Sequence, residues 1–406
     1  MTKISNLQPE GSRLAAVDAL RGWALFAIVI LHCLEHYNLF CVPQGLPSWL
    51  QTIDTAIFDT TFFILGGNAY ATFSLLFGFS FFIQMRNARR RGCDFRARFA
   101  LRMLLLAGFA LLHSLFYNGD ILLLYAFCGL FLIPASSCSN RTLIIISALL
   151  MLQPVAWIKV IYSSLNPGYV DTDSLFMPFA MAADQVGRNG NIMETLWSNL
   201  HDGILYSNLW QIESGRLFLT PALFITGMLL GRKNYFAVTE ESARFWKKVL
   251  TAGLIASVPL YCLKSHIPAL LDNPTTTAYY TVALARMFNV ATTAILVSGF
   301  MLLWIYRGSG YKLQRLLIPY GRMSLTNYIT QSIIGVSVFY HCGLGLYDKT
   351  GASACIAIAI IIATIQLIWS RMWLRRHRQG PLEYIWKKLT WLGSDSNSQK
   401  IRNFVA

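Results

Sequence analysis

Charged residues are scarce in this sequence of 406 residues. Asp, Glu, Lys and Arg make up 13% of it, whereas hydrophobic residues make up 55% and the mean hydropathy is +0.47. So few charges cannot cover the surface of a soluble globular protein. Lys and Arg still outnumber Asp and Glu by 34 to 19, but no basic stripe lies on a soluble domain, so we expect no nucleic-acid partner.

Closely spaced cysteine pairs are also missing. The eight cysteines show no CxxC spacing and mostly fall within apolar runs, which argues against a zinc ribbon and a disulfide framework. Cys41 and Cys342 remain a candidate pair. The segment HCLEH at residues 32–36 matches the H-x-x-E-H pattern of one class of zinc protease. It lacks a compelling downstream acidic ligand, so we expect no metal.

Apolar runs of about twenty residues recur along the chain, and each matches the roughly 30 Å core of a bilayer when coiled as a helix. The strands of a transmembrane β-barrel would instead alternate polar and apolar residues. The sequence therefore predicts an all-α, polytopic membrane protein with about ten transmembrane helices, with membrane lipids as its surroundings. The predicted spans lie near residues 20–39, 58–84, 99–117, 121–136, 142–162, 215–231, 249–271, 279–306, 318–340 and 352–373.

Seven arginines lie in the single short loop between Arg86 and Arg102. Cytoplasmic loops collect Lys and Arg, so this loop is predicted to be cytoplasmic. Alternation then places both termini in the cytoplasm, with a cytoplasmic segment at 1–19, a transmembrane bundle at 20–373 and a cytoplasmic amphipathic tail at 374–406. The same map makes 163–214 an outer loop, which contains an amphipathic segment suited either to lie on the outer leaflet or to cap the bundle.

Ionisable residues inside predicted spans are costly and mark candidate functional sites. Arg21 and His32 lie eleven residues apart on the first span, which places them on one helical face about 16 Å apart. Glu35 follows one turn later. A lone membrane histidine can also do no more than form an interhelical hydrogen bond, so both interpretations of His32 stay open.

Asp120 falls in the turn between the third and fourth predicted spans, at the depth of His32. A carboxylate that orients an imidazole makes it a competent general base, which makes His32, Asp120 and Glu35 the candidate catalytic residues. Asp120 could instead cap the helix that follows it, and the two roles are compatible.

Arg96, Arg98 and Arg102 open the third span, and the last two share a helical face. Such guanidinium groups suit a polyphosphate, although membrane orientation and lipid headgroups also explain an arginine cluster. The ninth span opens with the polar segment GRMSLTNYITQS at 321–332. Arg322, Asn327 and Gln331 in this segment either line a polar cavity or hold helices together.

Five segments resemble the YeiB family of bacterial inner-membrane proteins. They are VDALRGWA at 17–24, FSLLFGFSF at 73–81, GDILLLYA at 119–126, GRMSLTNYITQS at 321–332 and GPLEYIWKKLT at 380–390. The C-terminal part, about 230–395, resembles the domain of unknown function numbered 418. The resemblance implies a multi-pass protein of the bacterial inner membrane.

A wider similarity concerns transmembrane acyltransferases of the O-antigen acetylase type. Their first helix carries Arg or Lys, ten intervening residues and then His, as Arg21 and His32 do here. They also carry an arginine motif at a later helix, which Arg96, Arg98 and Arg102 resemble. YeiB-like proteins frequently have Asn where this sequence has His32, which implies that many relatives manage without this histidine.

This similarity implies an O-acyltransferase of the cell envelope. An acyl-CoA donor would bind from the cytosol through Arg21 and the three later arginines, and an envelope glycan or lipid hydroxyl would accept the acyl group outside. A transporter or lipid flippase is the main alternative, because scattered intramembrane charges such as Arg216 and Arg286 suit one equally well. A noncatalytic partner of an envelope-assembly complex is the third.

Overall fold

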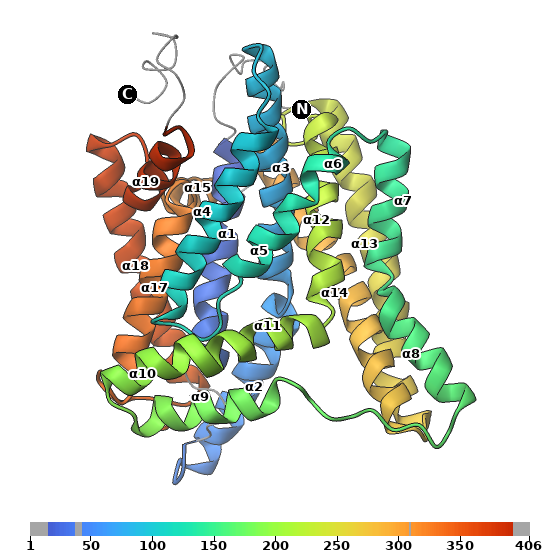
Figure 1. Ribbon diagram of the computed structural model, residues 1–406, viewed down its shortest axis with the longest axis vertical. Helices are drawn as coiled ribbons and strands as arrows, with labels where there is room; N and C mark the ends of the chain where they lie inside the picture. The colour runs from blue at the N-terminus through green and yellow to red at the C-terminus, as the bar shows by residue number, and fades with distance from the viewer. Residues whose placement is uncertain (1–14, 37–42, 308–309, 393–406) are drawn as a thin grey trace.

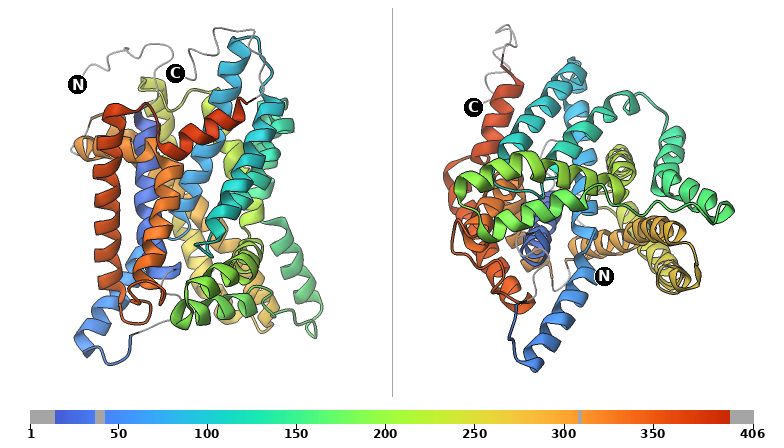
Figure 2. Two further views of the ribbon diagram at one scale, coloured as in Figure 1. Left: turned by 60° about the vertical axis from the view of Figure 1, so that its left-hand side comes forward. Right: turned by 60° about the horizontal axis from the view of Figure 1, so that its bottom comes forward.

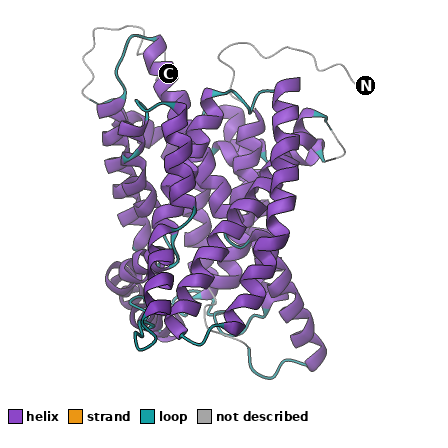
Figure 3. Ribbon diagram, turned by 90° about the vertical axis from the view of Figure 1, so that its right-hand side faces the viewer, coloured by secondary structure: helices purple, strands orange, loops and turns teal. Residues whose placement is uncertain are grey.

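A computed structural model describes residues 15–36, 43–307 and 310–392. These residues form helices joined by loops and contain no strand (Figure 3). Residues 1–14 of the predicted N-terminal segment, Cys41 of the candidate cysteine pair and residues 393–406 of the predicted tail lie outside the described residues. The α-helices are α1 (Ala15–Leu31), α2 (Ser48–Leu65), α3 (Asn68–Arg90), α4 (Arg96–Ser114), α5 (Leu122–Leu130), α6 (Leu132–Ala135), α7 (Asn140–Met151), α8 (Pro154–Leu165), α9 (Met177–Asn189), α10 (Ile192–Ser198), α11 (Ile204–Glu213), α12 (Arg216–Arg232), α13 (Glu240–His266), α14 (Pro274–Ile305), α15 (Tyr311–Leu316), α16 (Ile318–Arg322), α17 (Ser324–Phe339), α18 (Ala352–Arg376) and α19 (Pro381–Thr390), and the shorter helical turns are η1 (His32–His36), η2 (Asn199–Gly203) and η3 (Ile267–Leu270).

The bundle has the helices of a multi-pass membrane protein. Within the described residues, 6 helical stretches are long and apolar enough to cross a bilayer, or up to 8 if two bent helix pairs each count as one span. Several stretches turn apolar side chains outward, and Leu254, Ile255 and Val258 of α13 are examples. An apolar exterior of this kind is suited to lipid.

Helix α1 runs through the middle of the bundle (Figure 1) and has the most buried apolar stretch of the candidate spans. Its backbone comes very close to that of α16, because a Cβ added at Gly22 would overlap the carbonyl of Leu317 and one at Gly321 would overlap the carbonyl of Asp18. Small residues at such crossings are typical of membrane helices. This packing fixes the position of Arg21 and His32 relative to α17.

Two short layers of helices lie across the ends of the bundle. Helices α9, α10 and α11 lie across one end (Figure 1), and α19 crosses over the bundle at the other end (left view of Figure 2). The start of α1 lies at the α19 end. The predicted amphipathic segment of the 163–214 loop forms part of the α9–α11 layer, where Ser207 and Gln211 face inward and Trp197 is 74% exposed.

Three helical runs are broken at residues with left-handed backbone conformation. Gly67 precedes α3 with φ 76°, Gln153 precedes α8 with φ 58° and Gly215 precedes α12 with φ 75°. A non-glycine residue keeps this conformation only where its surroundings impose it. The breaks bend α7 against α8 by 45° and the α10–α11 run against α12 by 72°.

Candidate functional site

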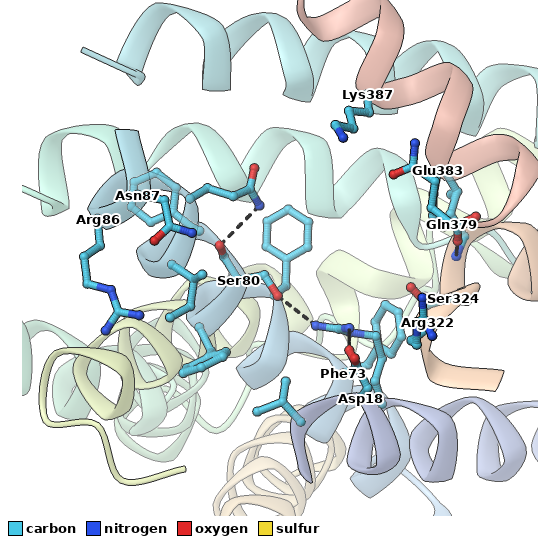
Figure 4. Close-up of a pocket in the computed structure, with 18 of the residues that line it drawn as sticks. Asp18, Phe73, Ser80, Arg86, Asn87, Arg322, Ser324, Gln379, Glu383 and Lys387 are labelled. Atoms are coloured by element: carbon cyan, nitrogen blue, oxygen red, sulfur yellow. Dashed lines mark hydrogen bonds and ion pairs between the residues drawn. The ribbon is translucent and has the colours of Figure 1, made fainter. Parts of the chain in front are cut away.

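A large cavity opens at the α19 end of the bundle. It has a volume of about 940 Å³ and is lined by residues of α1, α3, α4, α17 and α19, among others. Figure 4 shows polar and charged side chains from these separate helices gathered around the cavity. The charged residues of its lining are Asp18, Arg21, Arg86, Arg90, Arg91, Arg102, Arg307, Arg322, Glu383 and Lys387. Cations outnumber carboxylates in this set, so the cavity suits an anionic ligand.

Arg21 is held in place on the cavity wall. Its Nη1 donates to Asp18 Oδ1 at 2.9 Å and its Nη2 donates to Ser80 Oγ at 2.9 Å. Asp18 lies one turn earlier on α1, and Ser80 belongs to α3. The guanidinium is therefore oriented by two helices, and part of its charge is offset by Asp18.

Arg102 also lines the cavity, where it packs on the α19 layer. Its guanidinium carbon lies 3.6 Å from the ring centre of Trp386, whose Nε1 donates to the Arg102 carbonyl at 3.0 Å. Trp386 itself lines the cavity. This pair is a close cation–π contact, which fixes the Arg102 guanidinium against α19.

Arg96 and Arg98, the other two predicted arginines, do not line the cavity. Arg96 makes an exposed ion pair with Asp94 at 3.0 Å, and the backbone N–H of Arg96, followed by its guanidinium, lowers the pKa of the Asp94 carboxyl. Arg98 Nη1 donates to the carbonyls of Thr390 at 3.3 Å and Leu392 at 3.0 Å. It therefore caps the C-terminal end of α19, so the structure brings only Arg102 of the three to the cavity.

Glu383 connects the segment 380–390 to the segment 321–332 through hydrogen bonds. Its Oε1 accepts the backbone N–H groups of Leu325 at 2.7 Å and Thr326 at 3.1 Å, and its Oε2 accepts the Thr326 hydroxyl at 2.6 Å. The carboxylate thus caps the first turn of α17, where negative charge is favoured. A Cβ at Gly380 would overlap the Glu383 carboxylate, which explains the glycine immediately before α19.

The predicted polar residues of the segment 321–332 separate into two groups. Arg322 lines the cavity and donates to the Arg378 carbonyl at 2.9 Å. Asn327 is fully buried away from the cavity and donates to the Tyr320 carbonyl and to Ser370 Oγ, at 3.0 and 2.9 Å. Asn327 therefore holds helices together. Gln331 lies deeper on α17 and faces His32.

A buried histidine–aspartate pair lies below the cavity. His113 Nδ1, in the last turn of α4, lies 2.8 Å from Asp120 Oδ1, and both side chains are almost wholly buried. Asp120 Oδ2 accepts the N–H groups of Leu122 at 3.0 Å and Leu123 at 3.4 Å. Asp120 thus caps the start of α5 and orients an imidazole at the same time.

The free electron pair of this imidazole is on Nε2. The Asp120 carboxylate accepts a hydrogen bond, so the proton of the neutral ring lies on Nδ1. His113 Nε2 is buried and has no hydrogen-bond partner among the residues that the structure describes. A buried imidazole with a carboxylate on one nitrogen and an open second nitrogen has the geometry of a general base.

His32 lies beside this pair without bonding to Asp120. Its ring centre is 5.0 Å from that of Tyr117 and 6.0 Å from that of Tyr328, and its Nδ1 lies 3.5 Å from Gln331 Nε2. The rings of Tyr117 and Tyr328 lie 5.5 and 5.2 Å from that of His113. The structure therefore pairs Asp120 with His113 and not with His32 as expected from the sequence, because the turn after α4 brings Asp120 back beside the last turn of that helix.

Tyr328 connects the cavity with both histidines. It lines the cavity, contacts both imidazoles through its ring, and its hydroxyl accepts the N–H of Ile121 at 3.4 Å. From the opposite side, Ser207 and Gln211 of α11 donate to the Asp120 carbonyl at 2.6 and 3.1 Å. The His113–Asp120 dyad therefore lies between the cavity and the α9–α11 layer.

Glu35 lies in the turn η1 and is not a partner of Asp120. It is close enough to Tyr206 and Arg286 to interact electrostatically with both. Of the three predicted catalytic residues, only Asp120 belongs directly to the dyad. His113 was missed by the sequence analysis, although a histidine seven residues before Asp120, across the turn signal Asn118–Gly119, was a visible indication.

Comparison with known proteins relates the chain to one family model and to several bacterial proteins. Residues 230–393 match the family described as "Protein of unknown function (DUF418)". The chain is 25% identical to "Uncharacterized protein YxaH" of Bacillus subtilis (strain 168), across 98% of this chain and 100% of that protein. It is 28% identical to "Uncharacterized protein YeiB" of Escherichia coli (strain K12), across 93% of this chain and 96% of that protein. A protein of Bacillus acidopullulyticus, "Uncharacterized 39.9 kDa protein in amylase 3'region", is 26% identical across 93% of this chain and 94% of that protein. Residues 230–393 therefore carry the DUF418 domain, and the chain is similar to YeiB and YxaH over nearly its whole length.

Proposed function

We propose that this protein is a transmembrane O-acyltransferase of the bacterial inner membrane. An acyl-CoA donor binds in the cavity at the α19 end, and a hydroxyl of an envelope glycan or lipid accepts the acyl group from the side of the α9–α11 layer. The observation that carries this proposal is the buried His113–Asp120 dyad, whose imidazole ring centre lies 5.2 Å from that of Tyr328, a residue of the cavity wall.

The cavity has the chemistry that a CoA ester needs. Its cations supply planar donors for the phosphates, and Trp386 and Trp391 supply faces on which an adenine stacks. Among these cations, Arg21, Arg102, Arg322 and Lys387 come from segments that the sequence analysis singled out. The lower wall, around Tyr125 and Tyr328, is where the shorter acyl end would lie.

The dyad supplies the proton chemistry. His113 Nε2 removes the proton of the acceptor hydroxyl as its oxygen attacks the thioester carbonyl. A C–O bond forms, the C–S bond breaks, and the CoA thiolate leaves and takes the proton back from Nε2. Asp120 keeps the imidazole in the required tautomer. Tyr328, which lines the cavity and lies against the His113 ring, marks the place where the acyl group and the acceptor hydroxyl meet.

We also propose ten spans with both termini in the cytoplasm. This count adds α5–α6 and α17 to the eight candidate spans, because each predicted span overlaps one helix or one consecutive helix pair. A topology reporter inserted after Gly92 is expected to report cytoplasm, and one inserted after Asn189, between α9 and α10, the outer compartment. Finding both reporters on one side would overturn this orientation.

A transporter is the second candidate, because broken helices are common in transporters and three helical runs are broken here. Acetyl-CoA distinguishes the two. The purified protein, reconstituted in vesicles with an envelope lipid and glycan extract, is expected to move a radiolabelled acetyl group from acetyl-CoA to a hydroxyl of the extract. Binding of acetyl-CoA without formation of an acetyl ester, or no binding at all, would exclude the acyltransferase.

The donor site has a matched pair of test variants. Arg102→Lys keeps the charge but loses the planar fork, so we expect acetyl-CoA to bind about tenfold or more weakly. Arg96→Lys, on the same helix but outside the cavity, should bind acetyl-CoA as the wild type does. Affinity is measured by calorimetry in nanodiscs. Equal affinities of the two variants would remove Arg102 from the donor site.

A further inference from the structure

Three cations of α12, α13 and α14, which do not line the cavity, have no partner of opposite charge among the described residues. Arg216 begins α12, Lys264 lies near the end of α13, and Arg286 lies within α14. None of them forms an ion pair within residues 15–36, 43–307 and 310–392. The Nε atoms of Arg216 and Arg286 are buried and have no hydrogen-bond partner there either. Uncompensated charge inside a membrane protein is costly, so its counter-charge is expected to come from a ligand.

The three cations lie close to one another. A Cβ at Gly215 would lie 3.3 Å from Arg286 Cγ, so the Arg286 side chain passes directly beside the residue before Arg216. Lys264 and Arg286 are near enough to repel each other. Glu35 acts on Arg286 only at longer range. The cluster therefore concentrates positive charge that one nearby carboxylate does not cancel.

Two helix N-termini add to this positive field. Helices α3 and α12 pack side by side, and the hydroxyls of Tyr70 and Thr220 near their starts lie 2.6 Å apart. Neither helix has a side-chain cap at its N-terminus. The first N–H groups of a helix and its dipole favour an anion. Arg216 belongs to the first turn of α12, so the arginines and the two N-termini act on the same space.

Aromatic side chains surround the cluster. The Arg216 guanidinium carbon lies 4.1 Å from the ring centre of Trp210 and 4.6 Å from that of Tyr70. The Lys264 ammonium lies 5.3 Å from the ring centre of Phe288, which contacts Phe63, an exposed residue of α2. Aromatic rings beside cations are typical of the level at which lipid headgroups meet the hydrocarbon core.

We propose that Arg216, Lys264 and Arg286 form a binding site for a phosphate or diphosphate group, either of a membrane lipid or of a small phosphate compound. The planar guanidinium groups match phosphate oxygens in two-point contacts. The site lies about 24 Å from the α19 end, as measured along α12 from Arg216 to Arg232. None of the three cations lines the donor cavity, and the proposal stands whether or not the protein transfers an acyl group.

The test measures binding of two probes to the full-length protein in phosphatidylcholine nanodiscs. Inorganic pyrophosphate represents the small compound, and phosphatidic acid represents the lipid, each followed by native mass spectrometry and by thermal unfolding. We expect one of the two to bind and to raise the unfolding temperature. In Arg216→Gln and Arg286→Gln, that binding should be about 10- to 100-fold weaker.

Arg244→Gln is the matched control, because Arg244 is an exposed arginine of α13. It should bind the probes as the wild type does. Binding of pyrophosphate alone identifies a small phosphate compound, and binding of phosphatidic acid alone or more tightly identifies a lipid. The proposal is overturned if neither probe binds, or if Arg244→Gln weakens binding as much as the other two variants. Should Arg286→Gln fail to fold, Arg286→Lys, which keeps the charge but loses the planar guanidinium, replaces it in the comparison with Arg244→Gln.

Discussion

Replacing His113 by Ala is expected to reduce acyl transfer by roughly 10² to 10⁴, the usual contribution of a positioned general base. The reason is the geometry of the dyad, in which Asp120 holds Nδ1 and leaves Nε2 open. Alanine removes the only nitrogen that can accept the proton of the acceptor hydroxyl in this pair. The rate is measured as radiolabelled acetyl ester formed from acetyl-CoA by the reconstituted protein.

Stability has to be measured on the same variant. His113→Ala leaves Asp120 Oδ1 buried without its partner, which costs about 1–3 kcal/mol. His113→Gln restores a donor at the position of the imidazole but no base, so it is expected to unfold closer to the wild-type temperature and still to lack transfer. Loss of activity without loss of the folded state is the signature of a base.

A second histidine–aspartate pair provides the control. His201 Nδ1 lies 2.9 Å from Asp202 Oδ1, but the His201 side chain is 67% exposed in η2. His201→Ala should retain full transfer. Full transfer by His113→Ala would contradict the mechanism. If His32→Asn then abolished transfer, the base would be His32, as the first-helix spacing suggests.

The length of the hydrocarbon core explains why membrane-spanning helices were predictable, although 6 to 8 stretches of the described residues are long and apolar enough, where the sequence predicts about ten. Each predicted span overlaps one helix or a consecutive helix pair, because an apolar run of fixed length is required wherever a helix crosses lipid. The breaks within the helical runs were harder to predict from the sequence. Gly66–Gly67 lies inside the predicted span 58–84, and Pro154 lies inside 142–162. Gly and Pro are recognisable as helix breakers. The apolar run continues across them, however, so each run was predicted as one uninterrupted span.

The partners within the site could not be predicted, because the sequence gives the depth of a residue but not the direction in which its helix faces. His32 and His113 lie at one depth, and packing of α4 against α5 decides that Asp120 bonds His113. The same limit applies to the arginines. Arg98 and Arg102 share a helical face. However, α19 folds back over α4, and Arg98 donates to the carbonyls at the C-terminal end of α19 instead of lining the cavity.

Glu383→Ala is expected to lower the free energy of unfolding by about 2–4 kcal/mol, because it removes a charged helix cap that accepts three hydrogen bonds. Two of these come from backbone N–H groups at the start of α17 and one from the Thr326 hydroxyl. The loss is measured as a lower unfolding temperature in detergent, together with faster trypsin cleavage at Arg376 and Arg378, between α18 and α19.

Glu241→Ala is the matched control, because Glu241 also lies in the first turn of a helix but is exposed. It should change the unfolding temperature little. Glu383→Gln keeps one oxygen acceptor without the charge and should fall between the two. Because Glu383 ties α19 to α17, its loss should also release Trp386 and Lys387 from the cavity wall and weaken acetyl-CoA binding. An unfolding temperature of Glu383→Ala equal to that of Glu241→Ala would show that α19 is held by other contacts, chiefly the packing of Trp386 on Arg102.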